Sequence, residues 1–215
     1  MNEKTIYTAI SLVSLVIAVM IHEISHGLVA LYCGDTTARD AGRISLNPLR
    51  HIDPIGTIVL PLILVLSNVG FVFGWAKPVP VNISRCRNPR QAYWMTAIAG
   101  PLSNLVQALI AVGGYHLILS TTPAESISPF VGYALFACAI FAITNIVLMT
   151  FNLIPIPPLD GSRVMAVLLP EKLAIPYMRL ERFGFIILIV LLNLDVFSGL
   201  IEGVIGGFLK LSGIN

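Results

Sequence analysis

The stretch that decides the fold is TIYTAISLVSLVIAVMIHEISHGLVAL, residues 5–31, which contains a single charged side chain, Glu23. About 20 apolar residues are enough for a helix to cross a bilayer. The whole chain of 215 residues is 56% hydrophobic and only 11% charged, whereas soluble domains carry about 25% charged residues. We therefore expect an integral membrane protein. A soluble enzyme is excluded, and a net charge of +2 provides no basic field for nucleic acid.

Four more apolar stretches follow, at residues 55–74, 92–122, 127–159 and 183–209. The sequence predicts an all-α polytopic membrane protein, with residues 1–215 forming one membrane-embedded domain. We expect about four transmembrane helices rather than five. Residues 55–74 are left out of the count because they contain three glycines and a proline and barely reach spanning length. We expect that segment to be re-entrant or interfacial. Asp195 and Glu202 predict a break in the last stretch, with a helix over about 183–194 and an interfacial helix after it.

Residues 22–26 read HEISH and lie inside the first apolar stretch. Residues four apart share one face of a helix, so His22 and His26 can grip a single ion while Glu23 reaches a water molecule beside it. An acidic residue costs about 2.5–3.5 kcal/mol near the centre of a membrane helix. A polar cluster that only binds helices together is the alternative reading, but the pattern favours a metal site.

A catalytic zinc site typically has three protein ligands and an open position, so a third ligand is needed. Residues 151–161 read FNLIPIPPLDG, and three prolines within four positions cannot continue a helix. Non-helical backbone at membrane depth is tolerated where it lines a cavity. Asp160 is therefore the best third ligand, and an interfacial turn residue is its alternative role.

Five motifs together resemble the site-2 protease family of intramembrane zinc metalloproteases, in its compact bacterial branch without PDZ or CBS domains. They are HEISH, FNLIPIPPLDG, AGPLSN at 99–104, GRISLNPLRHIDPIG at 42–56 and GWAKPVPVN at 74–82. The resemblance implies that His22, His26 and Asp160 bind one Zn²⁺ per chain and that Glu23 is the catalytic base. It also implies an endopeptidase of the bacterial cell membrane, acting on membrane-anchored proteins in regulated intramembrane proteolysis.

Two asparagines in apolar segments, Asn104 and Asn152, are candidates for holding the oxyanion, since a buried amide needs a partner. Hydrogen bonding between helices is an equally good reading of both. His51 is a candidate pocket residue. We also expect a short membrane-associated β element near residues 38–50, in which residues 38–47 could pair with an unwound substrate; an ordinary interfacial loop is the alternative.

The charge distribution predicts the orientation. If residues 55–74 do not cross the membrane, eleven of the thirteen Lys and Arg residues gather on one side. Lys4 and Lys210 lie on the other side. The positive-inside rule then places the mouth of the site toward the cytoplasm and the N-terminus outside.

The expected partners are transmembrane-helix substrates and the lipid bilayer, with no nucleic acid and with the oligomeric state open. Two other readings remain: a membrane metal transporter or channel, which also places His, Glu and Asp at membrane depth, and an inactive homologue that binds helices without cutting them.

Overall fold

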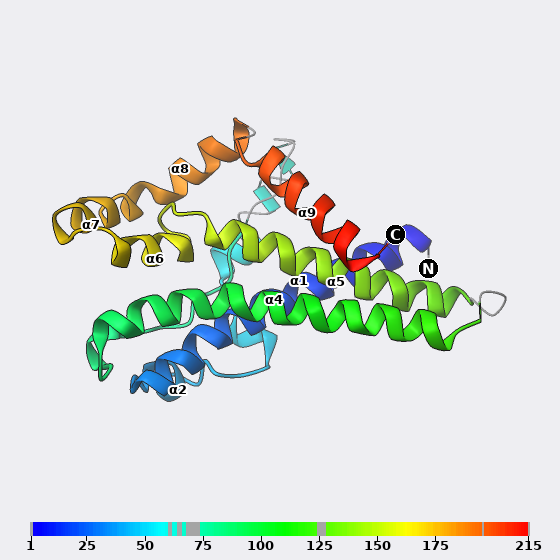
Figure 1. The fold of residues 1–215 in the computed structure, drawn as a ribbon, viewed down its shortest axis with the longest axis horizontal. Helices are drawn as coiled ribbons and strands as arrows, with labels where there is room; N and C mark the ends of the chain where they lie inside the picture. The colour runs from blue at the N-terminus through cyan, green and yellow to red at the C-terminus, as the bar shows by residue number, and fades with distance from the viewer. Residues whose placement is uncertain are drawn as a thin grey trace.

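The computed structural model describes residues 2–59, 62–63, 66–67, 74–123, 128–194 and 196–214. Three long helices form its body (Figure 1): α1 (Glu3–Cys33), α4 (Pro89–Thr121) and α5 (Pro129–Leu153). Each of the three is long and apolar enough to cross a membrane. The prediction of an all-α membrane protein is therefore confirmed.

The ends of the three long helices follow local rules. Asn2, Asn88 and Ser128 cap them, each with a side chain that accepts a backbone N–H of the first turn. Pro89 and Pro129 occupy the first helical position, where a missing N–H costs nothing. The chain leaves α1 through a glycine in the left-handed region, with φ 109°.

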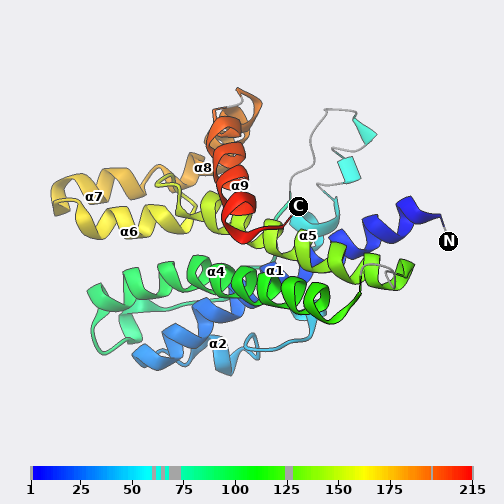
Figure 2. The same ribbon diagram turned by 45° about the vertical axis from the view of Figure 1, so that its right-hand side comes forward.

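Small residues hold the three long helices close together. Ala18 of α1, Ala97 and Ala108 of α4 and Ala142 of α5 are fully buried, which lets the helix backbones approach as in membrane interfaces. α4 lies beside α5 along its length in both views (Figures 1 and 2). The outward faces expose large apolar side chains such as Leu109, as expected of a surface that meets lipid.

Four shorter helices complete the chain: α6 (Asp160–Leu168), α7 (Glu171–Met178), α8 (Glu181–Asn193) and α9 (Ser198–Ser212). The expected fourth crossing at 183–209 is thus two helices of 13 and 15 residues, each too short to span. The predicted division near residue 194 is correct, although Asp195 itself lies outside the described residues. Among the described residues three helices reach spanning length, so a fourth single-helix crossing is not supported.

Packing explains why the last stretch divides. Phe197, between α8 and α9, is buried in a cluster with Leu188, Ile154 and Leu159, so the chain turns here to cover the segment that leads to α6. α9 then runs back obliquely toward α5 (Figure 1), and near its end Phe208 and Leu209 pack against the buried cluster around Ala142.

The segment predicted to be re-entrant begins and ends in the same place. A π-helix covers Pro54–Val59, and the N–H of Trp75 donates to the carbonyl of Gly56 at 3.1 Å. The two ends of a crossing segment would lie about 30 Å apart. These two described positions therefore meet, as a re-entrant or interfacial segment requires; most of residues 60–73 lie outside the described part.

The β element expected near residues 38–50 is not found. That stretch, which is fully described, contains part of the short helix α2 (Thr37–Asp40), a turn, and a 3-10 helix at Pro48–Arg50. The turn closes locally, because the N–H of Arg43 donates to the carbonyl of Ala38 and Gly42 adopts a φ of 63°. The hypothesis that residues 38–47 offer a strand to a substrate is therefore dropped.

A connection that we call the strap, residues 76–88, runs along the C-terminal half of α1. Its beginning is tied to the preceding loop, since the N–H of Lys77 donates to the carbonyl of His51 at 2.9 Å. Its end is tied to the end of α1, where the N–H of Arg87 donates to the carbonyl of Cys33 at 2.9 Å. Between these points it passes directly over Glu23.

Candidate metal centre

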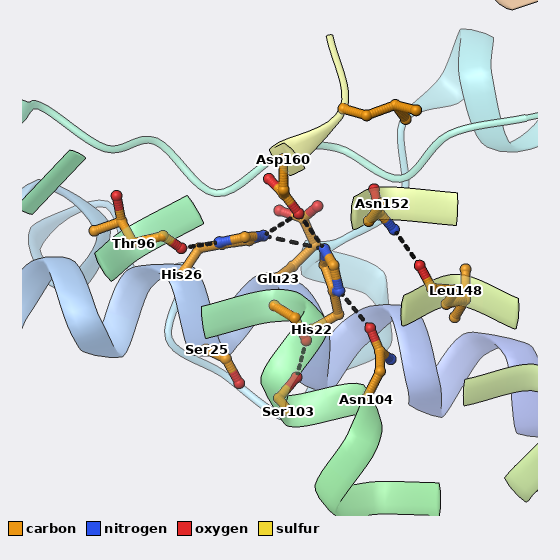
Figure 3. Close-up of polar contacts among 12 residues, drawn as sticks. His22, Glu23, Ser25, His26, Thr96, Ser103, Asn104, Leu148, Asn152 and Asp160 are labelled. Carbon is orange, nitrogen blue, oxygen red and sulfur yellow. Dashed lines mark hydrogen bonds and ion pairs between the residues drawn. The ribbon is translucent and has the colours of Figure 1, made fainter. Parts of the chain in front are cut away.

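Three buried side chains from two helices converge on one point (Figure 3). His22 and His26 lie one turn apart on α1, and Asp160 is the first residue of α6. The two Nε2 atoms are 3.0 Å apart, and they lie 3.2 and 3.3 Å from Oδ2 of Asp160. The structure thus brings together the three residues that the sequence singled out as ligands.

The other nitrogen of each imidazole is held by α4. Nδ1 of His26 donates to the backbone carbonyl of Thr96 at 2.6 Å, and Nδ1 of His22 contacts Oδ1 of Asn104 at 2.6 Å. An oxygen of this kind only accepts, so each Nδ1 carries the hydrogen. In a neutral imidazole the Nε2 atom then presents its lone pair, which is the form that binds a metal.

The donor set fits a zinc ion. Two Nε2 lone pairs and a carboxylate oxygen face one another, and Oδ2 of Asp160 is buried without a hydrogen-bond donor among the described residues. Ligands about 2.0–2.1 Å from a tetrahedral zinc lie about 3.3 Å apart, which matches the spacing here.

The AGPLSN motif explains how α4 comes so close to the imidazoles. A Cβ atom on Gly100 would lie 2.5 Å from Nε2 of both His22 and His26, so only glycine leaves room for the two rings. Asn104, one turn further on, is fully buried and meets His22. The motif therefore supplies both space and a hydrogen-bond partner.

The proline-rich motif explains the position of Asp160. α5 ends at Leu153, the chain continues without helix through the prolines, and Asp160 begins α6. A Cβ atom on Gly161 would collide with the carbonyl of Leu153, so glycine is needed for this sharp return. Burial of Ile154 and Leu159 against α8 and α9 fixes the loop, which gives the C-terminal helices a part in placing the ligand.

Glu23 points into the same region (Figure 3) and is half-buried. Its Oε2 atom accepts the backbone N–H of Val79, in the strap, at 2.8 Å. This hydrogen bond fixes the carboxylate beside the three converging side chains. The arrangement offers a base next to a metal site.

The other three candidate residues have different surroundings. Asn104 faces the Nδ1 side of His22, away from the converging atoms, which favours holding the imidazole over holding an oxyanion. Asn152 lies beside the centre (Figure 3), and its amide donates to the carbonyl of Leu148 at 3.0 Å within its own helix. His51 is outside the cluster, and its Nε2 contacts the carbonyl of Ser45 at 2.8 Å.

Sequence reasoning missed several contributors to the centre. The carbonyl of Thr96 and the N–H of Val79 are backbone groups, which carry no residue signature. Asn145, which contacts Asn104, is another amide in an apolar span, so the signal that singled out Asn104 could have found it. Gly100 lies in a motif that was recognised, but its contact with the imidazoles requires the structure.

Comparison with known proteins identifies the family. The chain is 40% identical over 182 residues to "Putative zinc metalloprotease YwhC" of Bacillus subtilis (strain 168), covering 83% of this chain and 78% of that protein. The chain belongs to the site-2 protease family, peptidase family M50. The model of peptidase family M50 itself matches residues 121–194, which include Asp160 but not the HEISH motif.

More distant members of the site-2 protease family match over most of their length. Rip2 of Mycolicibacterium smegmatis (strain ATCC 700084 / mc(2)155), with the same zinc metalloprotease name, is 27% identical over 91% of this chain and 71% of its own. Rip2 of Mycobacterium tuberculosis (strain ATCC 25618 / H37Rv) is 24% identical over 93% of this chain and 72% of its own. No solved structure matches the chain. The chain is a zinc metalloprotease of the membrane, and its cofactor is Zn²⁺.

Proposed function

We propose that this site-2 protease is an intramembrane endopeptidase that hydrolyses peptide bonds within or near transmembrane helices of membrane-anchored proteins. The observation that carries the proposal is the convergence of His22, His26 and Asp160 between helices of spanning length, with Glu23 beside them. His22 lies eleven residues before the end of α1, which is about 16 Å along the helix axis. That depth is about half of a ~30 Å hydrocarbon core.

In this proposal each residue has one task. His22, His26 and Asp160 hold the zinc ion, which when bound polarises the scissile carbonyl and makes a water molecule more acidic. Glu23 accepts the proton of the attacking water and passes it to the leaving amine. The N–H of Val79 keeps the Glu23 carboxylate aimed at the site. Asn152, half-buried beside the centre, is the better placed of the two asparagines for contact with the substrate or its oxyanion.

The substrates follow from the surroundings of the centre. A protease whose ligands lie between membrane helices meets other membrane helices, whose carbonyls are occupied by intrahelical hydrogen bonds. Cleavage therefore needs local unwinding, so substrates with a helix that unwinds easily are favoured. Release of membrane-anchored regulators is the process that such an activity serves.

The proposed orientation has the mouth of the site toward the cytoplasm. If residues 55–74 do not cross the membrane, the topology assigns eleven of the thirteen basic residues to the side where α1 ends, α4 begins and α5 ends, and the positive-inside rule makes that side cytoplasmic. Exposed positions allow a direct test, since Ser84 and Asn2 both lie on the surface at opposite ends. In a variant whose three native cysteines are replaced, an impermeant thiol reagent added to intact cells should label Asn2→Cys and not Ser84→Cys; the reverse pattern contradicts the orientation.

The activity is tested with the purified chain in detergent or vesicles, loaded with zinc and incubated with a panel of single-span membrane proteins. We expect cleavage inside or next to the span, loss of cleavage on chelation, recovery with Zn²⁺, and no cleavage by Asp160→Asn. Cleavage restricted to soluble loops far from any span would contradict the proposal. Zinc transport into vesicles by Glu23→Gln, without cleavage by the unaltered chain, would favour the transporter reading.

A further inference from the structure

A line of three hydrogen bonds leads from the backbone of α5 to the ring of His22. The amide of Asn145 donates to the carbonyl of Phe141 at 2.9 Å. The amide of Asn104 donates to Oδ1 of Asn145 at 2.8 Å, and Oδ1 of Asn104 contacts Nδ1 of His22 at 2.6 Å. Both asparagines are fully buried, so water does not compete for these groups.

The direction of every bond in this line follows from its first member. The carbonyl of Phe141 can only accept, so Asn145 must turn its NH₂ group toward it and its oxygen toward α4. That oxygen can only accept a hydrogen bond. Asn104 must therefore turn its NH₂ group toward Asn145, which leaves its own oxygen facing His22. Nδ1 of His22 then carries the hydrogen, and Nε2 keeps the lone pair that faces Asp160.

We infer that Asn145 is a positioning residue for zinc binding, acting through Asn104 on His22. Its hydrogen bonds among the described residues go to Asn104 and to the carbonyl of Phe141, and to none of the three candidate metal ligands. Its part is to fix which way the Asn104 amide points, and thereby which nitrogen of His22 is free to bind zinc. The inference rests on the proposed zinc site and deepens it by naming a residue on a separate helix, 41 positions from Asn104, through which it acts.

A purely structural role of Asn145 would have different consequences for metal binding. If Asn145 only joined α4 to α5, its loss would lower the stability of the protein and leave metal binding in the folded protein unchanged. If it fixes the Asn104 amide, its loss lets that amide turn, so that an NH₂ group competes with the imidazole N–H. Outer partners of zinc-binding histidines are typically worth about 10–100-fold in metal affinity.

The test uses two variants of equal size, Asn145→Val and Asn145→Thr. A threonine hydroxyl can donate to the carbonyl four residues earlier, as Thr150 does to Ile146 at 2.8 Å, and its oxygen can accept from Asn104. Valine can do neither. Affinity for Zn²⁺ is measured by chelator competition on the purified full chain, and ligand geometry by the visible absorption of the Co²⁺-loaded protein.

We expect Asn145→Val to bind Zn²⁺ about 10–100-fold more weakly with an altered Co²⁺ spectrum, and Asn145→Thr to recover most of the affinity. Because Asn145 acts through Asn104, adding Asn145→Val to Asn104→Ala should weaken binding no further. Thr150→Val, which removes a hydroxyl bond of the same kind on the same helix, should leave zinc affinity unchanged.

Equal affinities of the valine and threonine variants, or full additivity with Asn104→Ala, would overturn the inference. Should the valine variant fail to fold, Asn145→Ala and Asn145→Ser make the same comparison at smaller size. Wild-type zinc affinity in His22→Ala would overturn the zinc site itself, and with it this role of Asn145. A loss of zinc affinity without loss of thermal stability separates positioning from folding.

Discussion

His22 and Glu23 are neighbours in the chain, yet different regions of the molecule hold them. The imidazole of His22 is fixed from α4, through a buried amide in a tightly packed interface between long helices. The carboxylate of Glu23 is fixed from the strap, through one backbone N–H of Val79. In the proposed mechanism, metal binding and proton transfer therefore depend on separate supports, and we expect that each can be broken while the other is kept.

The largest effect is expected at Gly100, where α4 meets both imidazoles. In Gly100→Ala the new Cβ would lie 2.5 Å from Nε2 of His22 and of His26, so both rings must move. We expect loss of bound zinc, by more than about 100-fold in affinity since two ligands are displaced, and loss of cleavage with it. Gly113→Ala is the matched control on the same helix, because a Cβ there meets nothing within 4 Å; equal zinc binding by both variants would refute the close contact.

A smaller effect is expected where one ligand loses its partner. Asn104→Ala removes the acceptor of the His22 N–H and should weaken zinc binding by about 10–100-fold. Cleavage should return when zinc is supplied in excess, because Glu23 and the strap are untouched. Persistent loss of cleavage at saturating zinc would show that Asn104 also contacts the substrate, as the oxyanion reading requires.

A change that loosens the strap should disturb Glu23 without releasing zinc. Fully buried Asp35 anchors the strap, accepting the N–H of Asn82 at 2.6 Å and hydrogen bonds from Thr37. Asp35→Asn places an NH₂ group against one of these two backbone N–H donors, of Asn82 or of Thr37, and should cost roughly 1–3 kcal/mol of stability. Cleavage should slow by up to about tenfold while zinc content stays unchanged. Zinc loss in parallel with activity would contradict the separation of the two supports.

Asp35 also predicts a dependence of stability on pH. Burial raises the pKa of its carboxyl, but the hydrogen bonds from Thr37 and Asn82 outweigh burial and hold that pKa below its ordinary value of 3.8. A carboxyl whose pKa is lowered by folding stabilises the protein above its unfolded-state value, and this stability is lost as the pH falls through the folded-state value. Between pH 5 and about 3, thermal stability should fall more in the unaltered chain than in Asp35→Asn; parallel curves would contradict it.

The smallest effect is expected at Thr96, the partner of His26. The imidazole donates to the backbone carbonyl of Thr96, and the hydroxyl binds elsewhere, to the carbonyl of Ala92 at 2.7 Å. Thr96→Val keeps the shape and the carbonyl, so zinc affinity should stay within about threefold of the unaltered chain, far from the loss typical of a true partner. A loss as large as that of Asn104→Ala would show that the two histidines are held alike.

The two regions also differ in how well the sequence predicts them. HEISH has the spacing of one helix face and a charge in an apolar stretch, so His22, Glu23 and His26 could be found without a structure. Asp160 followed from prolines that end a helix. The support of Glu23 could not be found, because the N–H of Val79 is a backbone group and the strap has no periodic pattern.

The errors have physical causes as well. A β element was expected near 38–50 because an unwound substrate needs an edge to pair with, but local hydrogen bonds around Gly42 close the backbone into a turn. The role of Asn104 stayed open because an amide in an apolar helix needs a partner, and the sequence does not say whether that partner is a histidine, another helix or a substrate.

The most direct test of the central claim is zinc content measured together with cleavage in Glu23→Gln. A glutamine oxygen can still accept the N–H of Val79, and His22, His26 and Asp160 are untouched, so we expect about one zinc per chain, as in the unaltered protein. We also expect cleavage to be lower by about 10²–10⁴-fold, the usual contribution of a general base. Cleavage at the normal rate, or zinc loss as complete as in His22→Ala, would contradict it.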